Sequence, residues 1–196
     1  MKVISIEQDF RPIELSIESI VDKEKFLPEM VFRPPFNHFL FISQSDLFVP
    51  NYFLKHLKQY LINSHEKNFW VTALEPSPRL YYKKNFDIFG AFEFSTLDTD
   101  ADYLSAFNHY PKESNADALA YRGDTLLVSS FSKKWAVYAN REDEIAICAF
   151  SNSTQMELFK EAYGDDLLDG VEHAAEFAYR QYADITNIPK LCANYS

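Results

Sequence analysis

Apolar residues recur along this chain at two spacings, and each spacing predicts a different kind of element. Short runs rich in aromatic and β-branched residues predict strands at residues 2–6, 37–43, 68–74 and 85–95. The run at 37–43 is apolar on both faces, so we expect it in the middle of a sheet. Within 85–95, Gly90 falls on the apolar face, where we expect another group to pack closely.

Apolar residues three and four positions apart predict helices near residues 50–63, 99–109, 154–163 and 166–182. Pro50 suits the first position of a helix, where its missing N–H costs little. Thr99 with Asp102, and Thr154 with Glu157, have the spacing of N-terminal capping boxes. The fourth helix is expected to bury an apolar face made of Leu168, Val171, Ala175, Ala178 and Tyr182.

Three further strand patterns follow one another closely, at residues 125–131, 135–140 and 144–150. The polar links between them are only a few residues long, and such short links require antiparallel neighbours. We therefore predict an α+β fold in which an antiparallel or mixed sheet ends in a three-strand meander and is flanked by helices. A length of 196 residues, of which 47% are hydrophobic, fits a single domain over 1–196.

The cysteines and the first residues suggest where the protein works. Cys148 and Cys192 are far apart and lack the spacing of a disulfide framework, which suits a reducing compartment. The opening residues reach an acidic side chain at Glu7 without the apolar stretch of a signal peptide. No apolar run approaches the about 20 residues of a membrane-spanning helix. We expect a cytoplasmic protein without a membrane partner.

The charge is acidic and unevenly distributed. A net charge of -10 disfavours a nucleic-acid ligand, because phosphate binding needs concentrated Lys and Arg. Residues 99–196 hold 16 Asp and Glu against 8 Lys and Arg, whereas residues 1–98 hold 13 against 11. Asp165, Asp169 and Glu172 recur at helical spacing and continue to Glu176. This face is either ordinary solvated surface or a docking surface for a basic protein.

Motifs for nucleotide binding and for common hydrolases are missing from the sequence. Only four glycines occur, none clustered, so phosphate-cradling loops and the nucleophile elbow of α/β-hydrolases are excluded. The five histidines are scattered and lack zinc-site spacing. Ser129 and Ser130 follow an apolar strand and could serve as nucleophiles, although Ser is common at strand ends. We predict no catalytic residue and no cofactor.

One local group of residues could bind a metal ion. His173 and Glu176 are three positions apart on a predicted helix, next to Glu172. A catalytic metal site needs about three protein ligands, and the sequence supplies no obvious third. The alternative is a solvated helix face on which His173 pairs with Asp169. We favour this alternative and predict no metal site.

The meander carries residue types that dominate protein interfaces. Tyr138 and Arg141 lie on or beside a hairpin whose tip holds Glu142, Asp143 and Glu144. Trp135 shares a strand face with Val137 and Ala139, so we expect it in the core.

The segment 128–150 has a recognisable order of features: a strand ending in Ser-Ser, a Trp-x-x-Tyr strand, an acidic turn, and Glu-Ile-Ala-Ile. It resembles a pattern in small bacterial immunity proteins of polymorphic toxin systems, over about an eighth of the chain. Lys133 and Lys134 before Trp135 depart from that pattern. The resemblance implies a cytoplasmic, non-enzymatic inhibitor that binds one cognate toxin domain and blocks its active site or substrate path.

The leading hypothesis is therefore a toxin-neutralising binding protein with a basic toxin as partner. Its carboxylates would occupy the place of an anionic substrate. One alternative is a small-molecule-binding or hydrolytic enzyme with an aromatic-lined pocket, and another is a structural subunit of a larger assembly. The predicted partner-binding residues are Tyr138, Arg141, Glu142, Asp143, Glu144, Glu157, Glu161, Asp165, Asp169, Glu172 and Glu176.

Overall fold

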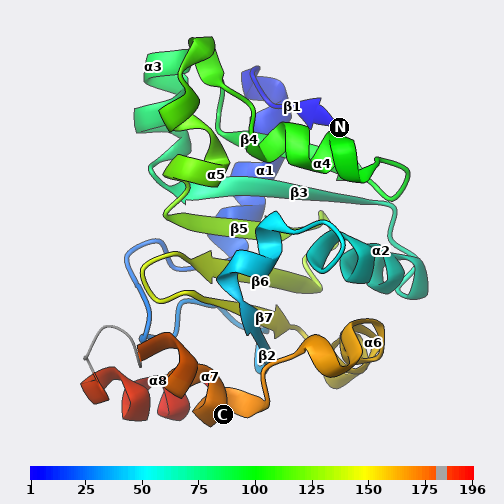
Figure 1. The fold of residues 1–196 in the computed structure, drawn as a ribbon, viewed down its shortest axis with the longest axis vertical. Coiled ribbons are helices and arrows are strands. Elements are labelled where there is room, and N and C mark those ends of the chain that lie inside the picture. Colours follow the sequence, from blue (N-terminus) through cyan, green and yellow to red (C-terminus); the bar gives the residue numbers. More distant parts are fainter. Residues whose placement is uncertain (180–184) are drawn as a thin grey trace.

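A computed structural model describes residues 1–179 and 185–196. Its centre is a seven-stranded sheet in the order β1-β4-β3-β5-β6-β7-β2, in which all neighbours are antiparallel (Figure 1). The strands are β1 (Lys2–Val3), β2 (His38–Ser43), β3 (Asn68–Glu75), β4 (Ala91–Ser95), β5 (Thr125–Ser129), β6 (Trp135–Asn140) and β7 (Ile145–Phe150). The α+β class and the C-terminal meander of β5, β6 and β7 are confirmed.

Helices cover both faces of this sheet, and each face has its own buried cluster. The first face carries α2 (Phe53–Asn63), α3 (Lys84–Phe86), α4 (Asp100–Phe107), α5 (Leu119–Arg122) and α6 (Ser153–Tyr163). The second carries α1 (Glu7–Ile20), α7 (Gly170–Tyr179) and α8 (Ile188–Tyr195). It also carries residues 21–36, which connect α1 to β2 and which we call the crossing. We call these the α2 face and the α1 face.

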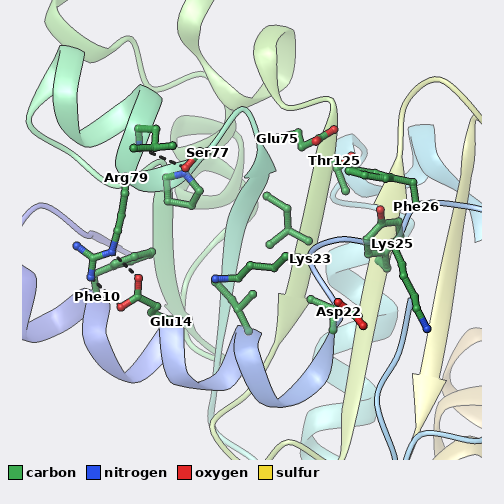
Figure 2. A pocket seen from close by; sticks show the side chains of 16 residues that line it. Phe10, Glu14, Asp22, Lys23, Lys25, Phe26, Glu75, Ser77, Arg79 and Thr125 are labelled. Carbon is green, nitrogen blue, oxygen red and sulfur yellow. Dashed lines mark hydrogen bonds and ion pairs between the residues drawn. The ribbon is translucent and has the colours of Figure 1, made fainter. Parts of the chain in front are cut away.

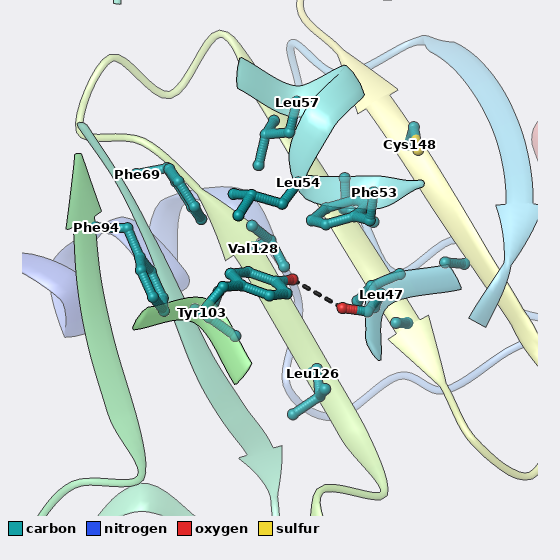
Figure 3. Close-up of a cluster of buried hydrophobic side chains, with 14 of the residues drawn as sticks. Leu47, Phe53, Leu54, Leu57, Phe69, Phe94, Tyr103, Leu126, Val128 and Cys148 are labelled. Carbon is teal, nitrogen blue, oxygen red and sulfur yellow. Dashed lines mark hydrogen bonds between the residues drawn. The ribbon is translucent and has the colours of Figure 1, made fainter. Parts of the chain in front are cut away.

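The α2 face is packed mainly by large side chains. Phe53 and Leu57 of α2 lie over the middle of the sheet in the close-up of this cluster, with Tyr103 of α4 nearby (Figure 3). The buried Tyr103 hydroxyl donates a 2.8 Å hydrogen bond to the Leu47 carbonyl in the 3₁₀ turn η1 (Gln44–Phe48). Trp135 is fully buried here on the same face as Val137, as its strand pattern predicts.

Strand β2 lies at the edge of the sheet, so the prediction of a central position is wrong. Its two apolar faces are explained by what covers them: α6 packs on one side and α7 on the other. The segment between these helices crosses the open edge, where the Leu168 N–H donates a 2.9 Å hydrogen bond to the Phe41 carbonyl. An edge strand can therefore have the sequence pattern of a central one.

The four predicted helices exist, with altered limits. The first begins at Phe53 and not at Pro50, and the last begins at Gly170 (φ 79°), after the short turn η5 (Gly164–Asp166). The predicted residues 180–182 of that helix, with Tyr182, lie outside the described residues. The capping box of Thr99 and Asp102 is confirmed. At α6 the cap is Asn152, whose side chain accepts from the Gln155 N–H, so the box predicted at Thr154 is wrong.

The strand predicted at 85–95 begins only at Ala91. Residues 84–86 form α3, and Asp87 and Gly90 then take left-handed backbone conformations, with φ 61° and 57°. The apolar alternation of Phe92 and Phe94 does belong to β4, and both are buried. A Cβ on Gly90 would come within 2.5 Å of the Tyr82 ring, which confirms that another group packs closely there.

Two helices on the α1 face, α1 and α8, were not predicted from the sequence. The chain passes from β1, which pairs over only two residues, directly into α1, and no side chain caps that helix. Helix α8 packs against the crossing at residues 21–36, where the Tyr195 hydroxyl accepts a hydrogen bond from the Val31 N–H at 3.0 Å. Among the described residues, no helix combines the length and the apolar character that crossing a bilayer requires.

Candidate functional site

The acidic residues predicted between Glu157 and Glu176 lie at the β2 end of the sheet, on α6, on α7 and on the segment between them (Figure 1). Residues 153–179 contain seven Asp and Glu but a single Lys, Lys160. Six of the seven were predicted to contact a partner, and the side chains of all six are exposed. We call these six the acidic end: Glu157, Glu161, Asp165, Asp169, Glu172 and Glu176.

The acidic end wraps around the edge of β2 instead of lying on one helix. Glu157 and Glu161 project from α6 on the α2 face, and Glu172 projects from α7 on the α1 face. Asp165 and Asp169 lie in the connection, because α7 begins only at Gly170. The single helix face predicted from Asp165 to Glu176 is therefore wrong.

Most of this negative charge is not compensated by the residues that the structure describes. Five carboxylates make no ion pair with a cation among the described residues: Glu157, Glu161, Asp165, Asp169 and Glu172. The seventh acidic residue, Asp166, accepts from His56 Nε2 at 2.9 Å. Nearby, burial and then the charge of Asp166 raise the pKa of the Asp46 carboxyl. Like charges thus accumulate here.

The tip of the meander is anchored to the chain. Arg141 donates to the carbonyls of Tyr121 at 2.6 Å and Ala120 at 2.9 Å, and its guanidinium lies 5.9 Å from the centre of the Phe48 ring. The Glu144 carbonyl accepts from the Gln44 N–H at 3.0 Å. Glu142 is the exposed side chain of the turn, while Arg141, Asp143 and Glu144 are half-buried. Arg141 therefore has a structural role at the C-terminal end of α5.

Tyr138 was predicted to contact a partner, but its side chain is only 2% exposed. The alternation of β6 places Trp135 on the α2 face and Tyr138 on the α1 face, where its ring meets Phe32 edge-on. Burial raises the pKa of the Tyr138 hydroxyl to about 12. A partner at the outer surface does not reach this ring, so we remove Tyr138 from the proposed contact surface.

The residues considered for catalysis or metal binding have other contacts. Ser129 Oγ is buried and donates to the Trp135 carbonyl at 2.6 Å, and the Ser130 and Ser132 hydroxyls lie 2.8 Å apart. His173 Nδ1 accepts from the backbone N–H of Asp169 at 3.4 Å. Within residues 1–179 and 185–196, no three His, Cys, Asp or Glu side chains are placed to share a metal ion.

A cavity of about 310 Å³ lies on the α1 face (Figure 2). Its wall is formed by α1, the following residues 21–26, the ends of β3 and β5, and the start of the π-helix η2 (Pro78–Lys83). The buried Tyr138 lines it together with Thr125. We call it the α1 cavity. Its apolar lining includes Phe10, Ile17, Val21, Phe26, Leu74 and Leu80.

One side of the α1 cavity is closed by an ion-pair network. Arg79 donates to both oxygens of Glu14 and to both oxygens of Glu7, while stacked Phe10 and Phe89 lie under its guanidinium. Arg11 also donates to Glu14, at 2.7 Å. Hydrogen bonds from Arg79 are the main cause that lowers the pKa of Glu14 to about 2. Glu14 therefore stays ionised although it is buried.

Comparisons with known proteins give no relative for this architecture. No family model matches the chain, and neither a curated protein nor a solved structure matches it.

The cavity is the feature that the sequence did not reveal. Its lining comes from α1, η2 and strands that are separated by more than a hundred residues, and no motif joins Glu14 to Arg79. The aromatic composition allowed a pocket, but its place depends on how α1, residues 21–26 and η2 pack against the strand ends.

Proposed function

We propose that this protein is a non-enzymatic immunity protein that binds a basic toxin domain through its acidic end. The observation that carries the proposal is the set of exposed carboxylates around the edge of β2, five of which lack an ion pair within the described chain. Glu142 can extend this surface, because it is the exposed residue at the meander tip. The toxin as partner comes from the resemblance of residues 128–150 to immunity proteins.

The charge distribution suits rapid capture of a cationic protein. Uncompensated carboxylates attract a basic surface, and such steering raises association rates by roughly 10-fold to 1000-fold at low ionic strength. Carboxylates that reach a toxin's substrate site stand in for the anionic groups of its substrate. Inhibition then needs no bond to be made or broken by the immunity protein.

The direct experiment is co-expression with a toxin domain encoded beside the gene. The expected result is rescue of growth and co-purification of the two proteins. The acidic end is then tested with the triple variant Glu161→Gln, Asp165→Asn and Asp169→Asn. We expect its association rate to fall about tenfold in low salt, with a weaker dependence on ionic strength than wild type.

A matched control removes the same charge elsewhere. Glu18, Glu24 and Asp100 are exposed carboxylates on α1, on the segment after it and on α4. Their combined replacement by amides changes net charge equally, so a purely global effect slows both triple variants alike. Equal slowing, or a toxin that neither binds nor is neutralised, contradicts the proposal.

A further inference from the structure

The α1 cavity has the composition of a ligand site. Its volume of about 310 Å³ is at the lower end of small-molecule pockets, which span roughly 300–1,000 Å³. Apolar side chains from α1 and β3 form its walls, and the lining also includes Thr125 and Tyr138, whose side chains carry hydroxyl groups. Apolar walls with a few polar groups are typical of sites that orient a small molecule.

The guanidinium group at the cavity already has anionic partners. Arg79 is bound by the carboxylates of Glu7 and Glu14, so a ligand anion would have to displace one of them. On the opposite side, Asp22 lies 3.5 Å from Arg33. In these ion pairs, the charges of Arg79, Glu14 and Asp22 are largely neutralised. The charge of a favoured ligand therefore depends on the lysines of residues 21–26.

Lys23 is the cation that reaches over the cavity. Figure 2 shows its side chain lying across the opening toward Glu14, whereas the side chain of Lys25 extends away from it. The ammonium group of Lys23 makes no ion pair or hydrogen bond with any described residue. Glu75, the exposed carboxylate of the lining, lies well apart from the Lys23 ammonium group in the same view.

The segment that carries Lys23 is held in place. The Asp22 N–H donates to the Val31 carbonyl at 2.8 Å, and the Tyr195 hydroxyl of α8 donates to the Glu29 carbonyl at 2.6 Å. Asn194 adds a 2.8 Å bond to the Pro28 carbonyl. The cavity wall is thus preorganised, which reduces the conformational cost of binding.

We propose that the α1 cavity binds a small molecule that has an apolar body and one anionic group, as in a short aliphatic or aromatic monocarboxylate. The body packs against Phe10, Ile17 and Leu74, and the anionic group pairs with Lys23. Among the described residues, the cavity lining offers a single unpaired cation directed over it, which matches one negative charge and not a polyphosphate. This site is separate from the acidic end.

The test uses three probes of equal size: phenylpropionate, phenylpropanol and phenylpropylamine. Binding is followed by protein amide chemical shifts, which also locate the site. We expect phenylpropionate to shift the amides of residues that line the cavity and to bind about three- to tenfold more tightly than phenylpropanol, the range of a partly exposed ion pair. The amine is expected to bind most weakly.

Substitutions in the cavity lining test whether the probes bind in the α1 cavity. Lys23→Met should weaken phenylpropionate about three- to tenfold and leave phenylpropanol unchanged, whereas Lys25→Met, the matched control, should change neither. Leu74→Trp, at a half-buried position, fills the cavity and should weaken both probes at least about tenfold. Thermal unfolding checks that each variant is folded, and Leu74→Phe is the milder replacement if the Trp variant is not.

Three results would overturn the proposal: no shift with phenylpropionate up to millimolar concentration, amine binding at least as tight as acid binding, or equal losses in the two lysine variants. These measurements need no toxin, and Lys23→Met leaves the acidic end intact. Failure of this site and failure of the proposed immunity function are therefore distinguishable.

Discussion

The two faces of the sheet are closed in different ways. On the α2 face, helices with clear apolar periodicity lie over the strands, and Phe53 and Leu57 are fully buried. On the α1 face, the cover is assembled from α1, the crossing at 21–36, α7 and α8, which come from both ends of the chain. Where α1 and the crossing meet η2 and the strand ends, the α1 cavity remains. A sheet face that is covered by several separate segments can keep a concave site between them, whereas a single continuous helix would fill that space.

The largest expected effect compares one phenylalanine from each face. Phe53 and Phe10 are at most 1% exposed and lie on helices. Phe53→Ala should lower the free energy of unfolding by about 4–5 kcal/mol, because it leaves a closed void. Phe10→Ala should cost about 3 kcal/mol, because the removed ring enlarges a cavity that is already present. Urea unfolding of both variants measures the difference, and an equal or larger loss for Phe10→Ala would contradict the comparison.

The next effect concerns the ion-pair network beside the cavity. Arg79→Met removes the donors that satisfy both oxygens of Glu14, whose side chain is only 11% exposed. We expect a loss of about 2 kcal/mol, since a buried carboxylate is left underpaired. Arg11→Met is the matched control: its side chain is 56% exposed and shares the same partner, so its loss should stay below about 0.5 kcal/mol. Comparable losses would show that Glu14 does not depend on Arg79.

Acid should reduce the contribution of this network. The pKa of Glu14 is lowered from 4.5 to about 2, chiefly by hydrogen bonds from Arg79. A lowered pKa stabilises the folded state fully above the unfolded value, and this stability is lost as the pH falls from about 4.5 toward 2. The difference in unfolding free energy between wild type and Arg79→Met should therefore shrink over that range. A difference that stays constant down to pH 2 would exclude the linkage.

Local signals in the sequence predicted most of the α2 face. Apolar spacing located α2, α4 and α6, and the capping box at Thr99 fixed the start of α4. Helix α1 on the other face was not predicted, although Phe10, Ile13, Ile17 and Ile20 recur there at helical spacing; like α2, it has no side-chain cap. The edge position of β2 was missed for a different reason: its second apolar face is covered by α7, more than a hundred residues later in the chain.

The candidate sites divide in the same way. Exposure of the acidic side chains could be predicted, because charge at helical spacing is a local property. Their wrapping around β2 could not be predicted, because it depends on Leu168 pairing with Phe41. Tyr138 was misplaced because strand alternation assigns it to the face opposite Trp135 but does not reveal that α1 and the crossing cover that face. Glu14 and Arg79, 65 residues apart, have no shared motif.

The smallest expected effect tests how local the signals of the α2 face are. Asn152 and Thr154 both suit an N-cap by residue type, yet only the Asn152 side chain accepts from the helix, at 3.0 Å from the Gln155 N–H. Asn152→Ala should lower the free energy of unfolding by about 1 kcal/mol, while Thr154→Ala, inside the first turn at an exposed position, should change it by less than about 0.3 kcal/mol. Paired thermal or urea unfolding gives both values. A larger loss at Thr154 would contradict this comparison and place the start of α6 two residues later, at the capping box that the sequence predicts.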